Sequence, residues 1–123
     1  MTLAEAIARL DTLKPNAFTD TEKRRWLTTL DGRIKNEILD MHEGGEAILA
    51  PVYDENADPM TVLLVPPPYD EVYLRYLEMQ VDYANEDYTK YNNSSVLFNE
   101  AYTAFERHYN RRVLPIGKAF RFF

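Results

Sequence analysis

One long helical stripe constrains the fold more than any other feature of this sequence. A capping box, Thr19 with Glu22, precedes a run of apolar residues at helical spacing: Trp26, Leu27, Leu30, Ile34, Ile38 and Met41. This spacing predicts an amphipathic helix over about 19–42 that buries one face, with Trp26 and Ile34 on that face.

The same segment also predicts a surface ion pair and a helix end. Asp31 and Lys35 are four residues apart, so we expect them to pair on the exposed side of the helix. Gly44 and Gly45 follow the last apolar position, and glycine adopts the left-handed conformation that commonly ends a helix.

Three further helices are predicted. The first covers about 2–13, where Thr2 and Glu5 form another capping box. A second covers about 69–88, after acidic residues that favour a helix start. The last begins near 96, after a break and cap at Asn92–Ser95, and ends near Arg112.

The helical period is absent from about 48 to 65. Ile48–Tyr53 and Thr61–Val65 are instead two short extended runs around a polar turn, so this part is a β-hairpin or an extended excursion. Pro51 lacks an N–H and would require an edge position in a hairpin. The predicted fold is therefore mostly all-α, with about four helices forming one domain over 1–112 and a tail at 113–123.

Composition limits the classes of protein. The chain has 123 residues and is 46% hydrophobic, enough for one core. Its longest aliphatic run, Val62–Val65, is far shorter than the roughly 18 residues of a membrane span. Residues 1–13 lack the basic start and apolar middle of a signal peptide. We expect a soluble protein that is not secreted by this route and has no membrane contact.

No familiar catalytic or cofactor pattern is present. The absence of cysteine excludes disulfides, thiol nucleophiles and cysteine–zinc sites. His42 and His108 have no ligand spacing and are expected to be ordinary helix-end or surface residues. With four glycines and no phosphate-binding loop motif, we expect no catalytic residue, cofactor or metal. The nine tyrosines favour core edges or subunit contacts over a surface that stacks sugars or bases.

Three carboxylates form a predicted acidic column on the third helix. Glu78, Asp82 and Glu86 follow one another at intervals of four, so they project on one helix face. Such a column could hold a divalent cation or supply an acid and a base. A solvated electrostatic face that serves assembly is favoured over a metal site, because no Glu-x-x-His motif provides partners from other helices.

Charge is divided between two regions. Residues 69–88 carry six acids and one base, net −5, whereas residues 101–123 carry one acid and five bases, net +4. Opposite charges on separate surfaces favour head-to-tail association between copies, which closes into a ring when the rotation permits. The alternative is pairing between the third and fourth helices of one chain. The overall charge of −6 argues against a protein that wraps nucleic acid.

The C-terminal tail is the second candidate functional region. Pro115 and Gly117 disfavour continuation of the last helix, and the tail exposes apolar surface unless it packs on something. Docking on a neighbouring subunit or a partner protein is favoured over packing on the chain's own helices. The residues expected to dock are Ile116, Phe120, Arg121, Phe122 and Phe123.

A set of ordered segments carries a family resemblance. The segments are Lys14-Pro15-Asn16; Trp26-Leu27 with Leu30-Asp31-Gly32-Arg33-Ile34 and Glu37-Ile38; Leu63-Leu64-Val65-Pro66-Pro67-Pro68-Tyr69-Asp70 and Tyr73; and Tyr91-Asn92 with Phe98-Asn99. In this order they resemble the head–tail connector, or adaptor, proteins of tailed phages and prophages of Gram-positive bacteria. The resemblance covers most of residues 10–112 and consists of packing and turn residues.

The resemblance implies a mostly helical subunit that forms a ring beneath the phage portal and extends the DNA channel. Its implied partners are further copies of itself, the portal protein, the next neck or tail-completion protein, and DNA that passes without sequence-specific binding. Its implied location is the virion neck, and the host cytoplasm during assembly. An alternative is a cytoplasmic helical oligomer that binds and regulates a partner, and an enzyme is the third choice. Portal, protease and capsid genes beside this one would favour the connector.

Overall fold

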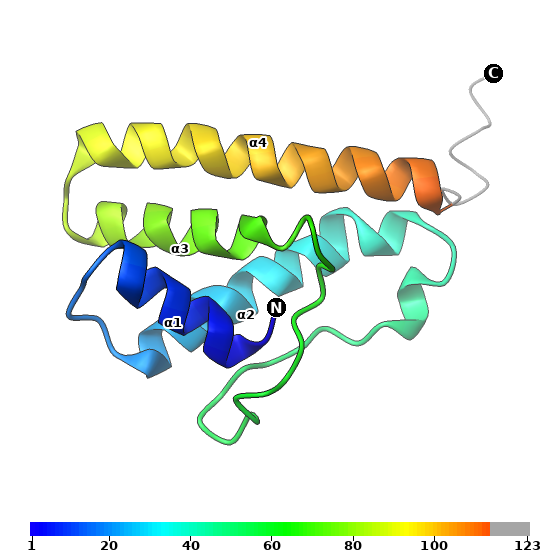
Figure 1. The fold of residues 1–123 in the computed structure, drawn as a ribbon. Helices are drawn as coiled ribbons and strands as arrows, with labels where there is room; N and C mark the ends of the chain where they lie inside the picture. Colours follow the sequence, from blue (N-terminus) through cyan, green and yellow to red (C-terminus); the bar gives the residue numbers. More distant parts are fainter. Residues whose placement is uncertain (114–123) are drawn as a thin grey trace.

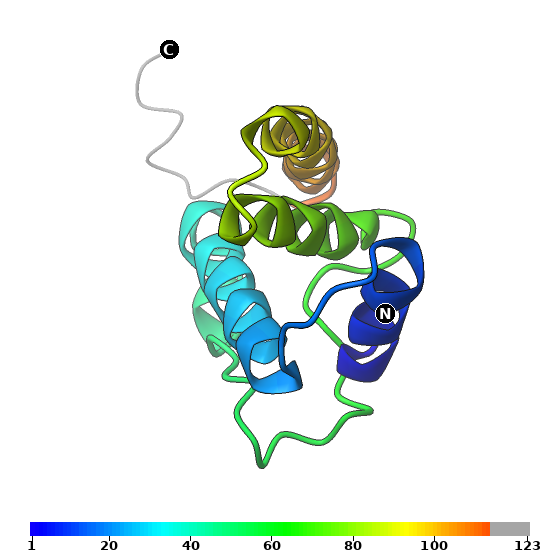
Figure 2. The ribbon, with the colours of Figure 1, turned by 90° about the vertical axis from the view of Figure 1, so that its left-hand side faces the viewer.

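Four α-helices dominate the computed structural model, which describes residues 1–113. They are α1 (Leu3–Leu13), α2 (Asp20–Glu37), α3 (Glu71–Ala84) and α4 (Tyr88–Arg112), with 3-10 turns η1 (Leu39–Met41) and η2 (Gly45–Ala47) after α2. Figures 1 and 2 show three levels: α4 lies on α3, and α3 lies on α1 and α2. The prediction of an all-α fold is confirmed.

The core forms where the apolar faces of α1, α2 and α4 meet α3. Each helix contributes side chains that are almost fully buried: Leu3 and Leu10 from α1, Leu27, Leu30 and Ile34 from α2, Tyr73, Leu74 and Leu77 from α3, and Phe98 and Phe105 from α4. Their recurrence at three and four residues places them on one side of each helix. The helical periods in the sequence therefore predict the buried faces correctly.

Both N-terminal caps are confirmed. The side-chain oxygens of Thr2 and Thr19 accept hydrogen bonds from the backbone N–H groups of Glu5 and Glu22, each at 3.2 Å. The second predicted helix, 19–42, is divided: α2 ends at Glu37 and η1 continues to Met41.

Gly44 has a φ of 81°, so a glycine in left-handed geometry follows η1, as predicted.

The boundary between α3 and α4 differs from the prediction. α3 ends at Ala84, where 69–88 was expected, and Glu86 takes a positive φ of 59° before α4 begins. The Asp87 carboxylate caps α4 by accepting from the backbone N–H of Lys90 at 3.2 Å. The predicted break at Asn92–Ser95 is wrong, because Asp87 caps the helix five to eight residues earlier and Asn92–Ser95 lie inside α4.

The segment between η2 and α3 is an extended excursion without a hairpin. The β pairing of this segment is an isolated bridge between Val62 and Thr2. The backbone around Val62 therefore pairs with the N-terminus: Leu3 N–H donates to the Thr61 carbonyl at 2.9 Å. Arg24 on α2 holds the other part, because its guanidinium donates to the carbonyls of Asp54 and Ala57 at 2.6 and 3.1 Å.

Two residues of the α2 stripe are less buried than predicted. Trp26 is partly buried and packs edge-on against Phe18, with 5.4 Å between ring centroids. Met41 is 55% exposed because the chain leaves the helical path after Glu37.

The predicted surface pair of Asp31 and Lys35 is wrong. Asp31 is fully buried, while the Lys35 ammonium pairs with Asp40. Asp31 faces the core because it shares the stripe of Leu27 and Ile34.

Candidate functional site

The most buried polar cluster centres on Asp31. Its two carboxylate oxygens accept hydrogen bonds from the hydroxyls of Tyr53 at 2.5 Å and Tyr73 at 2.7 Å. The Tyr73 hydroxyl in turn accepts from the backbone N–H of Val65 at 2.7 Å. The cluster thus joins α2, the extended segment and α3. The carboxylate, the two hydroxyls and the backbone N–H each have a hydrogen-bond partner, as buried polar groups usually do.

Burial controls the ionisation of this cluster. Loss of solvent raises the pKa of the Asp31 carboxyl, although the two tyrosine hydroxyls counteract this by donating to it. Burial, followed by the nearby Asp31 charge, also raises the pKa values of Tyr53 and Tyr73. Since all three side chains are buried, the geometry suits a structural tie between elements better than a site for substrate.

A second cluster joins three helical regions through Asp82. The Lys14 ammonium lies 2.6 and 2.7 Å from the two carboxylate oxygens, and the Ser94 hydroxyl donates to one of them. Asp82 is only 3% exposed, so removing either partner would leave a buried charge without full compensation. This cluster fastens the turn after α1 to α3 and α4.

The predicted acidic column on α3 is therefore wrong as a solvated face. Asp82 is buried and paired, Glu78 forms an ion pair with Arg75 at 3.3 Å, and Glu86 lies beyond the end of α3. The column fails because the helix ends at Ala84, which removes Glu86 from the four-residue repeat.

The acidic charges of residues 69–88 are mostly neutralised inside the subunit. Asp70 lies 3.2 Å from the amino group of Met1, and Glu71 lies 2.8 Å from the Arg9 guanidinium. No ion pair in residues 1–113 joins a carboxylate of α3 to an arginine of α4. The predicted α3 surface for head-to-tail contact is therefore not supported. Although α3 and α4 pack together, the alternative prediction that their opposite charges pair is not supported either.

The histidines contact neighbouring aromatic and polar groups. His42 is the C-cap of η1, so it is a helix-end residue as expected, but it is buried. Its ring nitrogens lie 2.6 Å from the Ile38 carbonyl oxygen and 2.7 Å from the Asn110 side-chain oxygen. His108 stacks on Tyr69 with ring centroids 4.3 Å apart. Across the part of the chain that the structure describes, no three His, Asp or Glu side chains are grouped to hold a metal ion.

No helix within residues 1–113 has the length and apolar character needed to cross a membrane.

The exposed surface holds a second kind of candidate site. We define the acidic segment as residues 49–62, where Leu49, Val52, Met60 and Val62 are 85, 67, 68 and 68% exposed. The same segment carries Asp54, Glu55 and Asp58 and no lysine or arginine. Within residues 1–113 none of these three carboxylates forms an ion pair. The acidic segment is thus both apolar and negatively charged.

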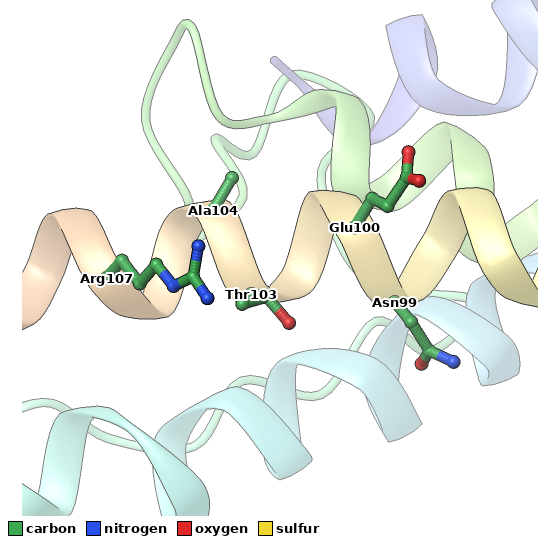
Figure 3. Close-up of a pocket in the computed structure, with 5 residues that line it drawn as sticks. All are labelled: Asn99, Glu100, Thr103, Ala104 and Arg107. Carbon is green, nitrogen blue, oxygen red and sulfur yellow. The ribbon is translucent and has the colours of Figure 1, made fainter.

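A shallow hollow lies on the outer face of α4. It has a volume of about 360 Å³ and is lined by Asn99, Glu100, Thr103, Ala104 and Arg107. Figure 3 shows the Arg107 side chain running along the helix toward Thr103 and Ala104, while Asn99 and Glu100 diverge to opposite sides.

We define the α4 outer face as this hollow with Val96, Leu97 and Arg111, which are also exposed. No ion pair within residues 1–113 involves Arg107 or Arg111.

The tail residues predicted to dock, Ile116, Phe120, Arg121, Phe122 and Phe123, lie outside the described residues. The predicted docking of the tail therefore stays a prediction.

Sequence reasoning missed the acidic segment as a surface. The sequence predicts two short extended runs here, Ile48–Tyr53 and Thr61–Val65, and this pattern does not indicate which of their side chains stay exposed. A charge count contains the missing signal, because residues 36–74 carry nine acids and no lysine or arginine. A span of this composition contains no lysine or arginine of its own, so ion-pair partners for its acids can come only from other segments or other molecules.

No family model, curated protein or solved structure matches this chain.

Proposed function

We propose that the chain is a structural subunit of a phage or prophage neck, a head–tail connector that forms a ring beneath the portal and extends the DNA channel. One observation carries the proposal: residues from separate segments of the resemblance meet in the buried Asp31 cluster. Asp31 comes from one of those segments and Val65 and Tyr73 come from another, and hydrogen bonds of 2.7 Å join the three residues. The ordered pattern thus coincides with the contacts that hold the fold together.

The distribution of surface charge also supports a subunit that assembles. The acidic segment and the arginines of α4 are exposed, and neither has ion-pair partners within residues 1–113. A net charge of −6 suits a wall past which DNA slides, since a negative surface does not retain phosphates. The proposed partners are the portal and the next neck or tail-completion protein, and the proposed location is the virion neck.

The test is the mass of native complexes of the full chain, alone and mixed with the portal protein encoded in the same genome. The connector function predicts a complex in which several copies of this chain accompany one portal ring. A chain that stays monomeric and does not bind the portal under any salt condition would overturn the proposal. An oligomer that forms alone but does not bind the portal would instead favour the alternative function, a helical oligomer that binds and regulates a partner.

A further inference from the structure

We propose that the acidic segment of one copy docks on the α4 outer face of the next copy, and that this contact is the repeating interface of the assembly. The inference rests on the proposed function and names the surfaces through which the ring would form. Its occupant is a second copy of this chain, identified by the apolar and charged groups that the two surfaces present.

Exposed apolar side chains mark both surfaces. Leu49, Val52, Met60 and Val62 are each at least 67% exposed, which makes the acidic segment the densest stretch of exposed apolar residues in the described chain. On the opposite side Val96 and Leu97, 57 and 42% exposed, continue into the hollow over Ala104. Apolar surface of this kind favours burial against a partner.

The charges on the two surfaces are complementary. The acidic segment carries three carboxylates and no base, whereas residues 101–113 contain three arginines and one acid, Glu106. Glu100 beside the hollow is the one exposed acid of the α4 outer face. Arg107 and Arg111 lie beyond Ala104 along the helix, so Glu55 and Asp58 of the next copy would lie nearest to them, away from Glu100.

The position of the two surfaces excludes contact within one subunit. In Figure 1 the acidic segment forms the lowest part of the molecule and α4 the uppermost, with α3 and the α1–α2 level between them. Figure 2, turned about the vertical axis, shows the same separation. The two surfaces therefore meet only between copies, in a head-to-tail contact that leaves a free surface at each end and closes when the ring is complete.

The acidic segment is held in shape before it binds. Arg24 donates to the carbonyls of Asp54 and Ala57, and the carboxylates of Asp54 and Asp58 accept from the backbone N–H groups of Asn56 and Met60. A surface already ordered in the free subunit loses less conformational entropy on association. Glu55 takes no part in these contacts, so it is the acid to substitute without disturbing the segment.

Cysteine cross-linking tests the contact directly, because the full chain has no cysteine of its own. Val52→Cys and Leu97→Cys are introduced in separate chains and together in one chain, and a short bismaleimide is the probe. The two single variants should cross-link when mixed and only weakly alone, and the double variant should give a ladder of dimers, trimers and larger species. Leu13→Cys on α1 replaces Leu97→Cys as the control and should give no ladder, although Leu13 is more exposed, at 60% against 42% for Leu97.

Charge reversal gives a second, independent readout. Glu55→Arg and Arg107→Glu should each lower the self-association constant at least tenfold, and the chain carrying both should recover most of it. Arg25→Glu, an exposed reversal on α2, should leave association unchanged. Circular dichroism of each variant verifies that the helices remain.

The outcomes distinguish failure of the proposed interface from failure of the proposed function. Val52→Cys chains that cross-link mainly to one another, or a Leu13→Cys control that cross-links as well as Leu97→Cys, would overturn the proposed contact. If the wild type assembles with the portal but no variant affects that assembly, the interface is wrong and the connector function stands. If the wild type assembles with neither itself nor the portal, both fail.

Discussion

At the residue scale, Asp31 shows how burial changes the meaning of a charge. An aspartate four residues from a lysine predicts a surface pair, but Asp31 faces the core and lies among tyrosine hydroxyls. The helical stripe predicts which face of the helix is buried, but it does not predict that the core can hold a buried carboxylate on that face. That acceptance requires Tyr53, which is 22 residues away in sequence and whose approach no local pattern indicates.

Asp31→Asn should remove one pH dependence of stability. Burial raises the pKa of Asp31 in the folded chain, so as pH rises above about 3.9 the unfolded chain loses its proton first. The free energy of unfolding of the wild type should therefore fall relative to that of the variant from about pH 4 upward, and level off above the folded-state pKa. Urea unfolding at several pH values measures the difference. If the wild type instead becomes more stable relative to Asp31→Asn as pH rises, the tyrosine hydrogen bonds outweigh burial in setting the pKa of Asp31.

Asp31→Ala tests the hydrogen bonds themselves. Two buried hydroxyls lose their acceptor, and each unsatisfied group costs about 1–3 kcal/mol, so the free energy of unfolding should fall by roughly 2–5 kcal/mol. The exposed Glu43→Ala, in the turn after η1, is the control and should change stability by less than about 0.5 kcal/mol. A neutral Asp31→Ala would show that the cluster does not tie the elements together.

Replacing Leu30 by alanine should destabilise the chain more than replacing Trp26, although tryptophan is the larger residue. Leu30 is fully buried, so Leu30→Ala should cost about 2–5 kcal/mol, whereas Trp26 is only partly buried against Phe18 and Trp26→Ala should cost less. Urea unfolding ranks the two variants. Iodide should quench the emission of the single tryptophan in part, and complete protection from iodide would contradict its position at the core edge.

At the scale of elements, the existence of the four helices and the N-termini of α1 and α2 could be predicted, whereas the boundary between α3 and α4 could not. Thr2 and Thr19 cap helices where the sequence predicts caps, because a hydroxyl followed by an acid three residues later is a local signal. The turn at 85–87 depends on a positive φ at Glu86, and a glutamate gives no sign of this. Of the two arrangements predicted for 48–65, the extended excursion is observed and the hairpin is not. Arg24 and the N-terminus, which lie far away in sequence, supply the partners of the extended segment.

Asn93→Ala distinguishes a helix interior from a helix cap. Asn93 is exposed in the second turn of α4, where alanine has the higher helix propensity, so the substitution should raise the free energy of unfolding by about 0.5 kcal/mol. Asp87→Ala removes the cap and should lower it by about 1 kcal/mol. Thermal unfolding measures both. A destabilising Asn93→Ala would restore the break that the sequence predicted at this place.

At the scale of the whole molecule, the sequence predicts opposed charge but assigns it to the wrong surface. A count over residues 69–88 treats all acids as free, although Asp70, Glu71 and Asp82 have partners from the N-terminal part of the chain. In the segment predicted as a hairpin or an extended excursion, by contrast, Asp54, Glu55 and Asp58 have no ion-pair partner within residues 1–113. The three-dimensional pairing, rather than the composition, decides which charges remain available to another molecule.

Salt should therefore weaken self-association without abolishing it. The Debye length shrinks from about 10 Å at 0.1 M salt to about 3 Å at 1 M, which screens exposed pairs such as Glu55 with Arg107. The contacts of Met60 and Leu97 are apolar and persist at high salt. Sedimentation equilibrium should show an association constant that falls with salt and then reaches a plateau.

Glu55→Gln should flatten the salt dependence, whereas Met60→Ser should lower the plateau and leave the slope unchanged. An association constant that rises steadily with salt in every variant would mean that charge plays no attractive part in the contact.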